Sequence, residues 1–122
     1  FWVTPVDDPD GGDLIFDFLV PIEPRSVLLV DINPPPNPGA TFLLRDGAGR
    51  RRIYSIDAGW TGTWGNAGPH RLDLTTLAPQ PGNATPTWAR ATEDAGFTHS
   101  DVRRIIFHNL SFGAMDELTI CH

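Results

Sequence analysis

Four aspartates lie close together in the sequence and have the chemistry of a cation site. They fall within seven residues and include two adjacent glycines between them: Asp7, Asp8, Asp10, Gly11, Gly12 and Asp13. Calcium takes six to eight oxygen ligands, which the carboxylates and backbone carbonyls of a flexible loop can supply. The spacing differs from an EF-hand, because no Asp-x-Asp-x-Asp-Gly run with a closing glutamate is present. The segment predicts a calcium site, with a solvated acidic loop as the alternative.

Two tryptophans in a glycine-rich run, residues 60–66, form a second candidate site. Indole rings stack on the apolar faces of sugars, and neighbouring amide, carboxylate and imidazole groups can bind sugar hydroxyls. The side chains expected to contact a glycan are Trp60, Trp64, Asn66, Asp57, His70 and Trp88. Tryptophan is usually largely buried, so the alternative is that these rings close the core. A third possibility is an aromatic surface that adheres to another protein.

Catalytic motifs are missing from the sequence. The histidines His70, His99, His108 and His122 are dispersed without metal-ligand spacing, and no nucleophile elbow, phosphate loop or nucleotide fingerprint occurs. A glycosidase needs two carboxyl groups about 5–10 Å apart in a cleft, for which a chain of 122 residues leaves little room. We therefore predict a protein that is not an enzyme. The single cysteine, Cys121, excludes an intrachain disulfide and is expected to be a small buried apolar side chain.

The elements that must position these side chains are short β-rich runs separated by glycine and proline, which together supply 24 of the 122 residues. Strands are expected over residues 13–20, 26–33, 41–46, 51–57, 70–74, 101–108 and 113–121. Residues 41–46 and 51–57 form the best hairpin candidate, since a short glycine-containing loop joins them. Residues 34–38 predict a stiff extended connection, 79–86 a loop, and 87–95 a short helix that Gly96 ends.

The first of these runs shows apolar residues at period two, with Leu14, Phe16, Phe18 and Val20 on one face. Because Ile15 and Leu19 make the other face apolar too, we expect this strand to be covered on both sides.

Length and composition favour one all-β domain over residues 1–122, an antiparallel sandwich or jelly roll of about eight strands. No apolar run approaches the roughly 20 residues that span a membrane. The net charge of −6 argues against nucleic acid, whose phosphates need a basic surface. All nine basic residues are arginines.

Three segments together resemble a known family: residues 7–18, residues 26–32, and Val102-Arg103-Arg104-Ile105 with residues 111–118. The pattern is similar to secreted bacterial β-sandwich domains of the PEP-CTERM type, which carry a closing small-Gly-Ala-Ile-Asp-Asp/Glu-Leu strand. The resemblance implies a secreted galactose-binding-like or carbohydrate-binding jelly roll, extracellular or at the bacterial cell surface. It also implies a calcium ion that bridges early acidic residues to the closing strand, with Asp8, Asp10, Asp13 and Asp116 as ligands. Asp116 shares strand parity with Leu118 and Ile120, so its side chain is expected to point inward.

Two functions follow as expectations. The first is a secreted, non-catalytic carbohydrate-binding module with a structural calcium ion. The alternative is a self-assembling subunit of an extracellular filament, sheath or matrix. In that case the apolar residues 1–3 would pair with an open sheet edge of a neighbour as a donated strand.

Overall fold

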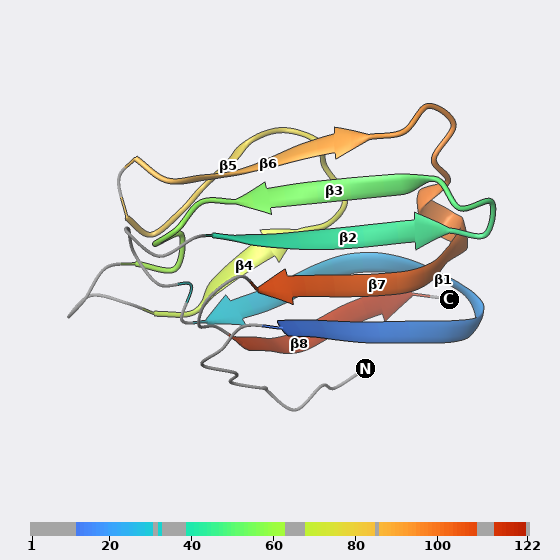
Figure 1. Cartoon of the computed structure of the whole chain (residues 1–122), viewed down its shortest axis with the longest axis horizontal. Helices are drawn as coiled ribbons and strands as arrows, with labels where there is room; N and C mark the ends of the chain where they lie inside the picture. The colour runs from blue at the N-terminus through green and yellow to red at the C-terminus, as the bar shows by residue number, and fades with distance from the viewer. Residues whose placement is uncertain are drawn as a thin grey trace.

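The computed structural model describes residues 12–30, 32, 39–62, 68–84, 86–109 and 114–121. They form eight strands and one 3₁₀ turn (Figure 1). The elements are β1 (Gly12–Val30), β2 (Ala40–Asp46), β3 (Arg51–Ile56), β4 (His70–Asp73), β5 (Gln80–Pro81), β6 (Trp88–Glu93), η1 (His99–Asp101), β7 (Val102–Asn109) and β8 (Ala114–Cys121). The predicted all-β antiparallel fold of about eight strands is confirmed.

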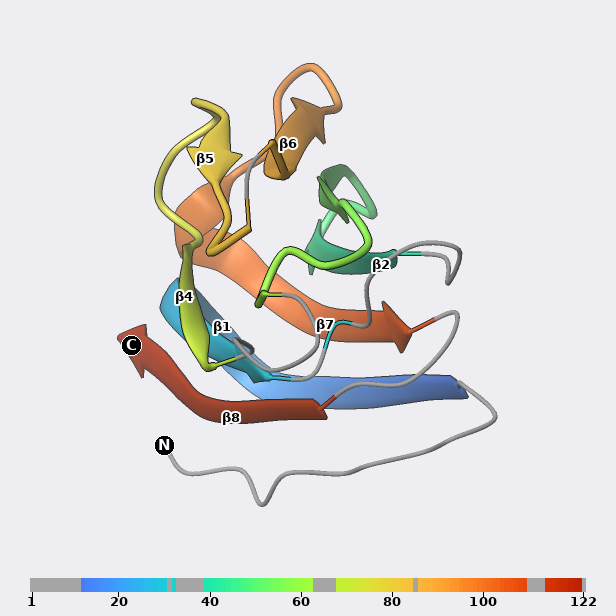
Figure 2. The ribbon, with the colours of Figure 1, turned by 90° about the vertical axis from the view of Figure 1, so that its left-hand side faces the viewer.

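The strands follow the order β4-β1-β7-β2-β3-β6-β5, and β8 pairs with β1. The long strand β1 belongs to both layers of the sandwich. Its first part pairs with β7, and its part from Glu23 to Val30 lies between β4 and β8. Figure 2 shows the sheet curled so that β5 comes back toward β4, which makes the sandwich nearly a closed barrel.

The prediction of two separate strands, 13–20 and 26–33, is wrong, because one bent strand runs from Gly12 to Val30. Proline lacks the N–H that a ladder needs and is tolerated at irregular positions. Pro21 falls where the pairing with β7 is interrupted between Asp17 and Ile22. Pro24 adjoins a register shift in the pairing with β8. The prolines therefore bend β1 between the two layers and do not end it.

The predicted helix over 87–95 is also wrong, because the segment forms strand β6 beside β3. Its alternating pattern places Ala89 in the core, opposite Ile56. A helix over these residues would have only a thin apolar stripe to bury, whereas the strand pairs with β3 and buries Ala89. The predicted 41–46/51–57 hairpin is confirmed as β2 and β3.

The core lies between the two layers, where Phe42 and Phe107 pack with ring centroids 6.1 Å apart. The prediction that both faces of β1 are covered is wrong, because its outer face is exposed. Ile15 is 52% exposed and Leu19 is 98% exposed. Nothing in the described part of the chain covers these two side chains fully.

A β-bulge in β8 decides where Asp116 lies. Glu117 has a φ of 44°, and near it β8 advances by three residues while β1 advances by two. Met115 and Leu118 are consequently both buried, and Asp116 between them is partly exposed. The expectation that Asp116 points inward is wrong, because the extra residue breaks the strand parity on which it depended.

Candidate functional site

Two of the predicted glycan-binding residues, Asp57 and Trp88, meet where β3 ends and β6 begins. The Trp88 N–H donates to Asp57 Oδ2 at 2.8 Å, and the Asp57 N–H donates to the Trp88 carbonyl at 3.0 Å. Arg90 extends the pair, with its guanidinium 5.7 Å from the centre of the Trp88 ring and 3.7 Å from Asp57 Oδ2. The backbone pairing thus fixes an indole, a guanidinium and a carboxylate beside one another.

An open hollow of about 460 Å³ is lined by Pro79, Trp88 and Arg90. The Trp88 side chain is partly exposed, and the Arg90 side chain is 58% exposed. The indole and the proline ring give the hollow an apolar lining, and the Arg90 guanidinium, which lies over the indole ring, adds hydrogen-bond donors. This arrangement suits a ligand that has an apolar face and oxygen acceptors along its edge.

Trp60, in contrast, lies in the core and is completely buried. Its Nε1–H donates to the Gln80 carbonyl at 3.1 Å, and its ring centroid lies 4.3 Å from that of His70. His70 Nε2 in turn bonds the Pro81 carbonyl at 2.8 Å. For Trp60 the alternative of a core role is correct, and Trp60 and His70 hold β5 against the rest of the sheet.

Asn83 is a structural residue that the sequence analysis missed. Its side-chain amide donates to the carbonyl of Thr61 at 3.1 Å and to that of Gly68 at 3.3 Å. It therefore fastens both ends of the segment that contains Trp64 and Asn66, two predicted site residues that lie outside the described residues. Asparagine in a turn is common, and this loop preference was the only signal available.

The predicted calcium ligands fall into two groups. Asp8 and Asp10 lie outside the described residues. Asp13 bonds His108 Nδ1 through its Oδ1, and Asp116 Oδ1 accepts from the Glu117 N–H at 2.8 Å. In the part of the chain that the structure describes, no group of three or more histidine, cysteine or carboxylate side chains could hold a metal ion.

A buried arginine organises the opposite end of the sandwich. Arg52 binds Glu93 Oε2 at 2.6 Å, donates to the Leu74 carbonyl at 2.9 Å and contacts His99 Nδ1 at 3.2 Å. Its guanidinium also lies 5.0 Å from the centre of the Phe97 ring. Every part of the cation therefore has a partner, as a buried charge requires.

His99 is the member of this cluster whose protonated form is disfavoured. Burial and the adjacent Arg52 cation lower the pKa of His99 below its usual value. The Pro24 carbonyl lies near enough to favour the protonated ring, but Nε2 makes no hydrogen bond of normal geometry. The contact with Arg52 places the acceptor at Nδ1, so the neutral ring carries its proton on Nε2.

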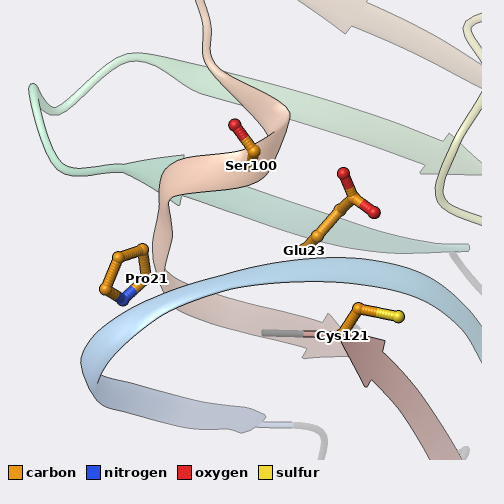
Figure 3. Close-up of a pocket in the computed structure, with 4 residues that line it drawn as sticks. All are labelled: Pro21, Glu23, Ser100 and Cys121. Carbon is orange, nitrogen blue, oxygen red and sulfur yellow. The ribbon is translucent and has the colours of Figure 1, made fainter.

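A second hollow, of about 360 Å³, lies at the same end and is lined by Pro21, Glu23, Ser100 and Cys121 (Figure 3). Glu23 is bound to Arg25 at 2.6 Å. Cys121 is exposed, which corrects the expectation of a buried thiol: β8 ends there, opposite Glu23. No base lies within hydrogen-bond distance of the thiol among the described residues.

No protein-family model, no curated protein and no solved structure matches this chain. Among the described residues, no helix is long and apolar enough to cross a membrane.

Proposed function

We propose that the protein is a non-catalytic glycan-binding module whose ligand lies against Trp88. The observation that carries the proposal is the hollow between Trp88, Arg90 and Pro79, where a partly exposed indole stands beside a guanidinium. A sugar ring can lie on the indole or the proline, and its oxygens can accept hydrogen bonds from Arg90. Trp64 and Asn66 follow Asp57 closely in the sequence and are proposed to add to the same site.

Rigid support for this site comes from the backbone. Two hydrogen bonds tie Trp88 to Asp57, and Ala89 beside Trp88 is buried in the core. A binding residue held on a strand has little conformational entropy to lose when the ligand binds. We infer from the resemblance to secreted bacterial domains that the glycan is extracellular.

The test is a glycan array on the full chain, followed by calorimetric titration of the best hit. Trp88→Ala should weaken binding at least about tenfold, and it should leave the fold intact because the side chain is partly exposed. Leu19→Ala removes another exposed apolar side chain, outside the hollow, and is the matched control. An array without hits, or equal binding by the two variants, would reject the proposal.

We also propose a structural calcium ion held by Asp8, Asp10, Asp13 and Asp116. Such an ion would hold the start of β1 to β8, so a chelator should lower the melting temperature and leave glycan specificity unchanged. Asp116→Asn should remove the chelator effect, and Asp73→Asn serves as the control. A melting curve that does not respond to calcium or chelator contradicts this part of the proposal.

A self-assembling extracellular subunit is the second candidate. The exposed Ile15, Leu19 and Val20 on β1 favour it, because adjacent exposed apolar residues mark contact surfaces. Asp13 and Asp17 on the same strand disfavour edge-to-edge pairing, since charged residues on edge strands discourage it. Light scattering at high concentration tests this second candidate, because a self-assembling subunit must associate, whereas glycan binding neither requires nor excludes association.

A further inference from the structure

The outer face of the sheet carries a continuous apolar row across four neighbouring strands. The pairing register places Ile15, Ile106, Leu43 and Ile53 side by side, one each on β1, β7, β2 and β3. We call these four residues the apolar row. Ile15 is 52% exposed and the other three are partly exposed, in contrast to their inward-facing neighbours on the same strands. The row was invisible in the sequence, because its members are far apart along the chain.

A row of three arginines runs parallel to it, two residues further along the strands. Arg104, Arg45 and Arg51 lie directly opposite one another on β7, β2 and β3, and we call them the arginine row. Asp17 binds Arg104 through two hydrogen bonds, and Asp94 lies 3.3 Å from Arg51. Within the described part of the chain the central Arg45 makes no hydrogen bond or ion pair, and it acts on Asp17 through its charge alone. Like charges opposite one another on neighbouring strands destabilise a sheet, so an anion seated here would be favoured.

We propose that this face binds residues 1–10 of a second copy of the chain. The segment reads FWVTPVDDPD and combines the two complementary chemistries: apolar side chains first and three carboxylates after them. In this arrangement its aspartates neutralise the arginine row, and its apolar residues cover the apolar row. Asp8 and Asp10 cannot hold the calcium ion of the proposed function at the same time, so the association is expected in the calcium-free protein, and added calcium should weaken it. In an extended chain Asp8 and Asp10 point to the same side and lie about 7 Å apart, so they can reach two neighbouring arginines of the row, whose strands are about 5 Å apart.

Covalent geometry favours a second copy over the same chain. Gly12 lies in register with Ala40, two strands away, and Arg45 lies five residues further along β2. Strand spacing and rise place Arg45 about 19 Å from Gly12. Asp10 precedes Gly12 by two residues and is tethered within about 7 Å of it. The chain's own carboxylates therefore cannot all sit on the arginine row, whereas a second copy has no such tether.

The test is sedimentation equilibrium on the full chain over a wide range of concentration. The wild type should associate, and raised salt should weaken the association because it screens the charges. Arg45→Glu should weaken it at least about tenfold. Replacing Asp7, Asp8 and Asp10 by arginine should do the same in calcium-free buffer, where loss of the proposed calcium ligands has no effect. Arg71→Glu makes the same charge change on β4, outside this face, and should have little effect.

Mixing the two charge-reversed proteins gives the decisive result. Each protein should be monomeric alone. The mixture should form a heterocomplex, because the arginines introduced near the start of one protein meet the glutamate introduced on the sheet face of the other. Arg45→Gln, which removes the positive charge without adding a negative one, covers the case in which Arg45→Glu does not fold. A wild type that is monomeric throughout, equal effects of Arg45→Glu and Arg71→Glu, or a mixture without a heterocomplex would each overturn the proposal. None of these outcomes bears on glycan binding at Trp88.

Discussion

The side-chain amide of Gln80 pairs with the backbone of Asp73 as a neighbouring strand would. Gln80 Oε1 accepts from the Asp73 N–H at 2.8 Å, and Gln80 Nε2 donates to the Asp73 carbonyl at 2.7 Å. β4 and β5 are the two ends of the strand order. Gln80 therefore supplies one of the links between the two ends of the curled sheet, beside the bond from His70 on β4 to the Pro81 carbonyl on β5.

Gln80→Ala should lower the free energy of unfolding by about 1–2 kcal/mol, because two partly solvated hydrogen bonds are lost. Hydrogen exchange at the Asp73 amide should accelerate by more than the global change in stability explains. Urea denaturation with Ser55→Ala as the control measures the first effect. Unchanged exchange at Asp73 would show that the glutamine does not link β4 to β5.

Asp46→Asn should destabilise the β2–β3 turn by about 2 kcal/mol or more. Asp46 is 3% exposed, and its Oδ1 accepts from the N–H groups of Ala48 and Arg50 while its Oδ2 accepts from that of Thr98. The carboxylate thus holds both the turn and the loop before η1. Denaturant midpoints measure the loss, and Asp73→Asn, which changes an exposed side chain, is the comparison.

The lowered pKa of Asp46 predicts that the stability of the protein falls in acid. Burial opposes ionisation of Asp46, but the three N–H donors and Arg50 outweigh it, so its pKa is lowered. A folded-state pKa below the unfolded value near 3.8 gives stability that is complete above that pH. This stability is lost as the pH falls from there toward the folded value. Asp46→Asn should flatten the stability curve in that window, and an unchanged acid slope would refute the assignment.

His99 predicts a second pH dependence, at higher pH. Its folded-state pKa lies below its ordinary value of 6.5 because of burial and the Arg52 cation. The unfolded chain therefore binds the proton first as the pH falls, so stability is complete above about 6.5 and decreases below it. Glu23 favours the protonated ring and Arg25 opposes it, and these charges only adjust the window. His99→Asn keeps an acceptor for Arg52 and should remove the slope, whereas His70→Asn should retain it.

Local sequence patterns were sufficient for part of this fold. The β2–β3 hairpin was predictable, because period-two residues and a glycine loop lie within one short stretch. The bend of β1 and the Glu117 bulge were not, since both depend on how distant strands pair. The same limit applies to the candidate site. Trp88 and Asp57 are 31 residues apart, and only the β3–β6 register brings them together.

Burial also separated two tryptophans that are alike in the sequence. Trp60 has a polar partner for its N–H within the core, so it is satisfied there, while Trp88 stands at the margin of the sheet with one side open. The residues next to Trp60 and Trp88 in the sequence indicate neither the burial of the first nor the exposure of the second. The arginine row is a further case, because Arg45 and Arg104 meet only through strand pairing.

Trp60→Ala should destabilise the protein by about 3–5 kcal/mol, as expected when a large buried ring is removed. Trp60→Phe should cost less, because it retains most of the volume and loses the bond to Gln80. Glycan binding by the folded Trp60→Phe protein should equal that of the wild type. A loss of binding without a loss of stability would place Trp60 in the site and contradict its position in the core.

Glycine at position 117 should be more stabilising than alanine, the reverse of the usual order in a strand. Glu117 has a φ of 44°, a left-handed conformation that costs an L-residue about 1–2 kcal/mol. Glycine removes this cost, and alanine retains it. Both substitutions remove the 3.5 Å ion pair between Glu117 and Arg71. This pair is half exposed and contributes little to stability, and its loss is the same in both variants, so it does not affect the comparison between them. We expect Glu117→Gly to exceed Glu117→Ala in unfolding free energy by about 1 kcal/mol. If alanine is the more stable, β8 has no left-handed bulge at this position, and the burial of Met115 and Leu118 on one face needs another cause.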